Sequence, residues 1–156
     1  MKSVPVVSRA LFLISLTAIP AATFAEPLVA FSSDGCSQFP NGTQAQPDLW
    51  LDCCMAHDAA YWAGGTADQR ALADQALQQC VAAKQQASVG ALMLMGVRIG
   101  GTPFMPTPFR WGFGWPLWRG YTPLSTLERI QVRQGWPAGI ALPAYLTEDA
   151  PTEISE

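Results

Sequence analysis

The pattern of apolar and polar positions predicts two helices joined by a very short turn. Residues 46–48 (Gln-Pro-Asp) resemble the first turn of a helix, and the glycine pair at 64–65 ends that helix. Residues 66–69 form a Thr-x-x-Gln capping box, and the alanine- and glutamine-rich run behind it predicts a second helix to about Ala87. With only two glycines between them, the helices are expected to form an antiparallel hairpin.

The segments that flank this hairpin follow other patterns. Residues 31–42 are rich in turn-forming pairs and predict a tight, irregular loop. After the hairpin, residues 89–97 form an apolar run too short to span a membrane, and residues 100–123 hold too much proline and glycine for a long helix. A Ser-x-x-Glu capping box at 125–128 starts a short third helix. The predicted fold class is mainly α, with an irregular C-terminal segment rich in proline, glycine and aromatic residues.

The first 25 residues resemble a secretory signal peptide. Lys2 and Arg9 form a basic start, residues 10–22 are apolar, and small residues occupy the expected cleavage positions. A retained membrane anchor is the alternative, but the apolar run falls short of about 18–20 residues and contains Pro20. We therefore expect cleavage of residues 1–25, no transmembrane segment in the mature chain, and a secreted or periplasmic location.

The mature chain is expected to be one domain over residues 26–145, followed by an acidic tail over 146–156 that is predicted to be disordered. Cleavage removes two basic residues and no acidic ones, which moves the formal net charge from −3 to −5. An acidic chain is a poor candidate for a nucleic-acid partner, because such binding needs a basic surface. The four cysteines all lie in the exported part, and this even count predicts two disulfides.

The strongest candidate for chemistry is the run of residues 53–61. In helical register Cys54, His57, Asp58 and Tyr61 lie at positions i, i+3, i+4 and i+7, which form one face. His57 is the only histidine in the chain. A histidine, a carboxylate and a phenol on one helix face indicate an enzyme site.

The hairpin is expected to bring Asp74 of the second helix to His57. His57 lies about 10 Å along the helix axis from the turn, and Asp74 lies about 13 Å from it on the facing helix. Asp74 shares a stripe with Leu77 and Val81, so it should be buried and need a polar partner. His57 and the Tyr61 hydroxyl are the obvious partners.

The cysteines provide a check on this register. A Cys53–Cys80 bridge would hold the two helices where His57 meets Asp74, which leaves Cys36 to pair with Cys54 and to hold the loop of residues 31–42 against the first helix. The other two pairings are less favourable. Adjacent Cys53 and Cys54 rarely bond to each other, and pairing Cys36 with Cys53 and Cys54 with Cys80 would need the two helix faces exchanged.

The chemistry of these groups points to hydrolysis. A histidine held by a buried carboxylate at one ring nitrogen presents the other as a base near neutral pH, and water is the expected nucleophile. Asp58 points toward the loop, and one carboxylate with several backbone carbonyls forms the hard-oxygen site that Ca²⁺ accepts. Such a cation would hold a phosphate and stabilise an ester oxyanion.

These residues resemble the secreted phospholipase A2 family. Its helix motif Cys-Cys-x-x-His-Asp-x-Cys-Tyr compares with Cys-Cys-Met-Ala-His-Asp-Ala-Ala-Tyr at 53–61, and its aspartate six residues before a cysteine compares with Asp74 and Cys80. Cys36 stands where that family has a cysteine in its calcium loop. The resemblance covers residues 31–81 and indicates a reduced, bacterial-type member, because Ala60 replaces a family cysteine.

The resemblance implies calcium-assisted hydrolysis of a phospholipid acyl ester of the sn-2 type at a membrane surface. His57 would activate water, while Asp74 and Tyr61 would orient and support it. Asp58 would bind Ca²⁺ with loop carbonyls. The loop departs from the family's glycine-rich sequence, so its ligands need a new assignment. We assign the backbone carbonyls to Gly35, Ser37 and Phe39. A side-chain oxygen of Asp34 or Asn41 is the alternative ligand.

The aromatic residues of 100–123 allow two interpretations. They are expected to wrap over the helix hairpin with their tryptophans buried, or to face lipid head groups beside Arg110 and Arg119. The second interpretation supports a rival function. In it the chain is a catalytically weak or inactive envelope-binding module that uses this aromatic segment.

Overall fold

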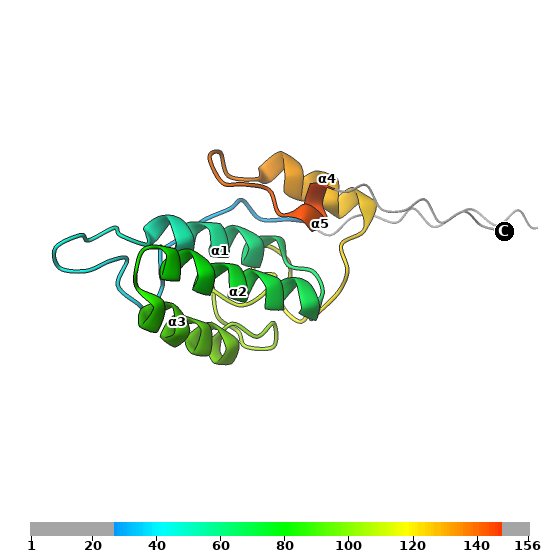
Figure 1. The fold of residues 1–156 in the computed structure, drawn as a ribbon. Coiled ribbons are helices and arrows are strands. Elements are labelled where there is room, and N and C mark those ends of the chain that lie inside the picture. Colours follow the sequence, from blue (N-terminus) through cyan, green and yellow to red (C-terminus); the bar gives the residue numbers. More distant parts are fainter. Residues whose placement is uncertain (1–26, 148–156) are drawn as a thin grey trace, which may run out of the picture.

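The computed structural model describes residues 27–147, and the predicted signal peptide lies outside them. Five helices follow one another in this part of the chain, and no strand occurs among the described residues: α1 (Leu51–Ala63), α2 (Ala67–Ala83), α3 (Ala87–Gly100), α4 (Thr126–Gly135) and α5 (Ala144–Thr147). The mainly α prediction is confirmed. Figure 1 shows α1, α2 and α3 side by side in one half of the molecule, with α4 and α5 across the other face of α1.

α1 and α2 form the predicted hairpin around the glycine pair. Gly64 and Gly65 have φ angles of 69° and 131°, a region that glycine adopts without strain. Thr66 and Gln69 complete the predicted capping box, because each side chain accepts the other's backbone N–H. The turn and the cap together force the chain back along α1.

The predicted boundaries of both hairpin helices were partly wrong. α1 begins at Leu51, because the backbone N–H of Gln46 bonds to the hydroxyl and carbonyl of Thr43 and the following residues make turns. α2 ends at Ala83, because the Gln85 N–H closes a tight turn on the Ala82 carbonyl, and Gln85 itself has a φ of 62°. The helix faces that carry the candidate residues are unaffected.

Both predicted disulfides are present, Cys36–Cys54 and Cys53–Cys80. Cys53 and Cys54 are both buried, although they are neighbours on α1, because one faces α2 and the other faces the loop before the helix. Around them lies the first hydrophobic cluster, whose buried members also include Trp50, Leu77, Val81 and Met93. The bridges therefore lie inside a packed core that holds α1, α2 and the loop together.

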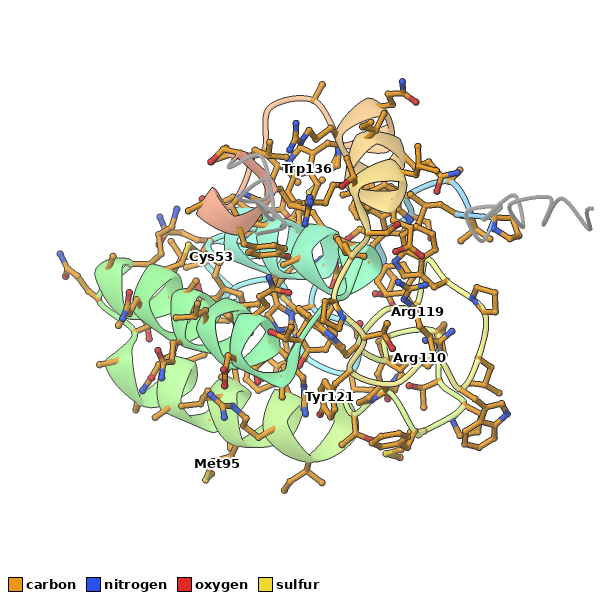
Figure 2. All side chains as sticks on the ribbon, turned by 90° about the vertical axis from the view of Figure 1, so that its right-hand side faces the viewer. Cys53, Met95, Arg110, Arg119, Tyr121 and Trp136 are labelled. Carbon is orange, nitrogen blue, oxygen red and sulfur yellow. A yellow bond between two sulfur atoms is a disulfide. The ribbon has the colours of Figure 1, made fainter. Side chains whose placement is uncertain are left out.

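Residues 87–100 form a helix that the sequence pattern did not assign. α3 packs closely against α2, since a Cβ atom at Gly90 would lie 2.7 Å from the Gln78 carbonyl oxygen. Its other face carries exposed apolar side chains, and Met95 points away from the protein in Figure 2. Apolar residues on all sides of a short helix leave no 3.6-residue stripe to recognise, which is why the pattern was ambiguous.

The segment of residues 101–123 wraps over the end of α1, as one of the two interpretations predicted. The indole N–H of Trp115 donates to the carbonyl of Ala63, the last residue of α1, which has no partner within the helix. The indole N–H of Trp111 donates to the carbonyl of Gly65 in the turn that follows. Both tryptophans are buried, whereas Trp118 is 67% exposed. The predicted burial is therefore confirmed for two of the three tryptophans.

The buried guanidinium of Arg110 holds this segment in shape. It donates to the carbonyls of Trp111, Gly112 and Trp115. Burial lowers the pKa of Arg110.

α4 begins at the predicted capping box of Ser125 and Glu128 and ends at Gly135. With α5 and Trp62 it forms a second hydrophobic cluster, in which Leu146 is completely buried. The described part of the chain thus includes the first two residues of the predicted tail, and residues 148–156 lie outside it. Among the described residues, no helix is long and apolar enough to cross a membrane.

Candidate active site

The site is built on the face of α1 that turns toward α2. His57 and Tyr61 lie one turn apart on this face, and their ring centroids are 4.1 Å apart. Both side chains are buried, and only 8% of the His57 surface is exposed. The register of α1 thus places an imidazole and a phenol together at the interface with the next helix.

α2 contributes Asp74, which is completely buried at that interface. Its Oδ1 atom lies 3.1 Å from His57 Nε2 and accepts a hydrogen bond of 2.7 Å from the Tyr61 hydroxyl. The hairpin therefore brings together the three residues that the sequence analysis assigned to catalysis. Since Nε2 is occupied by the carboxylate, Nδ1 is the ring nitrogen left for chemistry.

Two arginines that the sequence analysis missed balance the charge of Asp74. Arg98 Nε lies 2.7 Å from Asp74 Oδ2, and Arg70 Nε lies 4.0 Å from the same oxygen. The contact of Arg98 with Asp74 is an ion pair but not a hydrogen bond. Although the two atoms are close, no N–H group is aligned to donate to Asp74 Oδ2. Arg70 is four residues before Asp74 on α2, a spacing that could have predicted this pair. Arg98 comes from α3, so only the packing of that helix reveals it.

The Tyr61 hydroxyl remains protonated over the physiological pH range. Burial, followed by the negative charge of Asp74, raises the pKa of Tyr61 well above its ordinary value. The hydroxyl therefore serves as a permanent donor to the carboxylate.

The aromatic segment closes the site on the side of Tyr61. Trp111 makes an edge-to-face contact with the Tyr61 ring at 5.1 Å, and Gly112 donates its N–H to the Tyr61 carbonyl. Gly101 packs so tightly on the phenol that a Cβ atom there would lie 2.7 Å from the hydroxyl oxygen. The wrap thus shields the phenol and the carboxylate from water.

The predicted calcium-binding carboxylate, Asp58, faces the loop of residues 31–42. Its Oδ2 atom accepts a hydrogen bond of 2.6 Å from Ser33, whose hydroxyl in turn accepts the N–H of Gly35. Asp34 lies close enough to repel Asp58, and it accepts a bond of 2.8 Å from the Ser37 hydroxyl. The loop therefore places the Ser33 hydroxyl against Asp58 and the Asp34 carboxylate nearby.

The environment of the Asp58 carboxyl raises its pKa to about 7. Burial is the main cause, the Ser33 hydroxyl opposes it, and the negative charge of Asp34 adds to it. A partly buried carboxylate beside a second carboxylate is favourable for a divalent cation, whose charge would offset the burial cost and the repulsion that raise the pKa.

The two groups that the loop brings near Asp58 are the Ser33 hydroxyl and the Asp34 carboxylate, and both offer the oxygen ligands that a hard cation such as Ca²⁺ prefers. The side-chain oxygen of Asn41, the alternative ligand, already accepts a hydrogen bond from the N–H of Cys36. The single group of three acidic or sulfur ligands in the described ranges is Asp52, Cys53 and Cys80, whose sulfurs are bonded to each other. A cation at Asp58 would therefore need hydroxyl or carbonyl ligands, and the carbonyls of Gly35, Ser37 and Phe39 remain predictions.

The raised pKa of Asp58 predicts a specific pH dependence of stability. Between the ordinary pKa of about 3.9 and the folded value of about 7, the folded chain keeps a proton that the unfolded chain has lost. The free energy of unfolding should therefore fall as pH rises through this window, by about 1–2 kcal/mol for a partly exposed group. Urea unfolding with chelator at pH 4.5 and 7.5 would measure it.

Asp58→Asn should remove this dependence, because an amide does not titrate. Calcium should stabilise the wild-type chain more at pH 7.5 than at pH 5, since the ion competes with the proton, and should not stabilise the variant. An equal effect of pH or calcium on both proteins would contradict the assignment.

A cavity of about 250 Å³ lies elsewhere in the described region, between residues 28–31, Trp62 and α4. Neither His57, Asp58 nor Asp74 lines it. The acyl ester of a substrate held there would not be placed against the candidate base.

No protein-family model, curated protein or solved structure matches the chain. The functional assignment therefore depends on the arrangement of residues just described.

Proposed function

We propose that the chain hydrolyses the acyl ester of a phospholipid with water as the nucleophile, at the sn-2 position as the resemblance implies. The observation that carries this proposal is the contact of His57 Nε2 with the buried carboxylate of Asp74. It leaves Nδ1 to act as a general base. The oxygen-rich loop at Asp58, on the next residue of the same helix, supports a phospholipid as the substrate.

The residues have distinct roles in this reaction. His57 Nδ1 takes a proton from water as the water oxygen attacks the ester carbonyl carbon, and Asp74 stabilises the resulting imidazolium. The imidazolium then returns the proton to the leaving alkoxide as the carbon–oxygen bond breaks. The products are a fatty acid and a lysophospholipid.

Calcium held by Asp58, Asp34 and loop carbonyls would supply positive charge for the lipid phosphate and the ester oxyanion. Asp58 and Asp34 would then bind and orient the substrate through the ion, rather than take part in proton transfer.

Water is favoured as the nucleophile because all four cysteines are in disulfides. The described hydrogen bonds join His57 to Asp74 and involve no serine at the imidazole. The disulfides also support a secreted or periplasmic location.

The test is fatty-acid release by the purified mature chain from vesicles of mixed phospholipids. We expect release in millimolar calcium and loss of release when a chelator is added. Mass spectrometry of the lysophospholipid would show which acyl chain is removed. Absence of release from any phospholipid in calcium would refute the proposal.

A second candidate function is attachment to a lipid surface without hydrolysis. Trp118 favours it, because this exposed indole has a φ of 74°, a strained conformation for a residue other than glycine. Large apolar side chains are also exposed on α3 and the loop that follows it: Leu92, Met95, Ile99 and Phe104. Exposed tryptophan and aliphatic side chains suit the boundary between head groups and acyl chains.

Trp118→Ser is expected to weaken cosedimentation with phosphatidylcholine vesicles about 5-fold to 30-fold, because burial of an indole contributes roughly 1–2 kcal/mol. Leu127→Ser on α4 is the matched control, since Leu127 is 52% exposed and lies outside this surface. Equal binding by the two variants would exclude a role for Trp118. Trp111 and Trp115 cannot test this function, because both are core residues.

A further inference from the structure

Arg70 is a charged side chain that is almost completely buried, with 7% of its surface exposed. It lies on α2 one turn before Asp74, yet it is not the closest cation to that carboxylate. Arg98 is closer, at 2.7 Å against 4.0 Å. Burying a guanidinium is costly unless its donors are used, so the other contacts of Arg70 indicate what it does.

Arg70 connects four groups from three parts of the chain. Its Nε–H donates to the Tyr61 hydroxyl at 3.0 Å, and Nη1 donates to the Tyr121 hydroxyl at 2.7 Å. Its Nη2 donates to the carbonyls of Val97 and Arg98 at the end of α3. In Figure 2, Tyr121 lies where the aromatic segment meets the helices. The fork of a guanidinium can satisfy all four acceptors at once, which a lysine ammonium cannot do.

The bond from Arg70 determines where the single proton of the Tyr61 hydroxyl points. Arginine only donates, so the Tyr61 oxygen must accept from it. The one hydroxyl proton is then directed to Asp74 Oδ1, at 2.7 Å. Burial and the Asp74 charge keep that proton in place, because they raise the pKa of Tyr61.

The contact between His57 and Asp74 also has a defined donor. Asp74 is paired with Arg98 and acts as a carboxylate that only accepts, so His57 Nε2 must carry the proton of their contact. A neutral imidazole has one N–H, and Nδ1 is therefore left without a proton. The donor order runs from Arg70 through Tyr61 to Asp74, which also accepts from His57.

We propose that Arg70 is a positioning residue for the base: by donating to the Tyr61 hydroxyl it directs the phenol proton to Asp74 Oδ1, and so holds that oxygen where it accepts the Nε2 proton of His57 and leaves Nδ1 free. This role rests on the proposed function only in naming Nδ1 as the base. Because Arg70 also holds Tyr121 and the end of α3, it links the aromatic segment to the ring orientation of His57.

The role can be measured without a substrate, because His57 is the only histidine in the chain. Two-bond ¹H–¹⁵N spectra of the histidine-labelled mature chain should show Nε2 protonated and Nδ1 bare, with a slowly exchanging Nε2 proton. In Arg70→Gln that proton should exchange faster and its resonance should broaden, because the phenol no longer holds Asp74 Oδ1 in place; the tautomer should persist, since the carboxylate still accepts. An unchanged imidazole spectrum in folded Arg70→Gln would overturn the proposal.

Kinetics provide a second readout. Arg70→Gln should lower kcat about 10-fold to 100-fold and change KM by less than about 2-fold, since ring orientation affects the chemical step rather than binding. Tyr61→Phe should remove the same link, so the double variant should lose no more than Tyr61→Phe alone. Independent, multiplying losses would show that Arg70 acts by another route and would overturn the proposal.

Arg129→Gln is the control for removing a partly buried arginine. Arg129 donates to the Leu124 carbonyl, just before α4, and to the Thr126 hydroxyl in its first turn, away from the hairpin. Arg129→Gln should therefore change neither the spectrum nor kcat. If Arg70→Gln does not fold, Tyr61→Phe alone still decides, because an unchanged imidazole spectrum in it would overturn the proposal.

The two proposals fail separately. Spectra that respond as expected, in a chain that releases no fatty acid, would remove the hydrolase and keep the positioning role of Arg70. Fatty-acid release, with a spectrum and a kcat that do not change in Arg70→Gln, would keep the hydrolase and remove the positioning role of Arg70.

Discussion

His57→Ala is expected to lower fatty-acid release by roughly 10²-fold to 10⁴-fold, the usual contribution of a positioned general base. No other histidine in the chain can replace it. The fold should persist, because Asp74 keeps its bond from Tyr61 and its ion pair with Arg98. We expect a loss of about 1 kcal/mol in the free energy of unfolding, as for one hydrogen bond.

Met55→Ala is the matched control, since it shortens another side chain on the same helix without touching the site. Initial rates in calcium, together with urea unfolding of each variant, would separate chemistry from stability. Release by His57→Ala at the wild-type rate would remove histidine from the mechanism and favour attachment to lipid without hydrolysis.

Asp74→Asn is expected to affect both activity and stability. An amide presents a donor as well as an acceptor, so it no longer holds the His57 ring in a single state, and it removes the charge that stabilises the imidazolium. We expect a fall in kcat of about 10²-fold to 10⁴-fold. The free energy of unfolding should fall by about 2–3 kcal/mol, because Arg70 and Arg98 lose their buried counter-charge.

Asp52→Asn makes the same chemical change in the same hairpin and serves as the control. Asp52 pairs with Lys84 at the surface, where its side chain is 63% exposed, so we expect a change in stability below about 1 kcal/mol and no change in rate. Equal effects of the two substitutions would mean that the buried carboxylate has no special role.

These two predictions address different parts of one arrangement. His57 supplies the nitrogen that moves the proton, whereas Asp74 determines which nitrogen is free and stabilises the charge that forms. A result in which only His57 mattered would point to a base oriented by other contacts, such as the ring packing against Tyr61.

The central hairpin could be predicted from sequence because its determinants are local. The glycine pair, the capping box at Thr66 and the 3.6-residue period place His57 and Asp74 at similar heights on facing helices. The spacing of the cysteines carries the same register, so the pairings of Cys53 with Cys80 and of Cys36 with Cys54 followed from it.

The start of α1 and the existence of α3 were harder to predict. The Thr43 side chain takes a backbone N–H group that a helix would otherwise use, and composition does not predict which of the two bonds forms. In α3 the apolar residues surround the helix, and only its packing on α2 at Gly90 shows which face is internal.

The sequence by itself determined that α1 and α2 fold back on each other with an imidazole facing a carboxylate, because hairpin register depends on residues close together in the chain. Only the tertiary structure decided the surroundings of that pair. The ion pair of Arg98 with Asp74, the closure by Trp111 and the raised pKa of Asp58 all depend on segments distant in sequence. Such contacts follow from how the elements pack together, which no local pattern encodes.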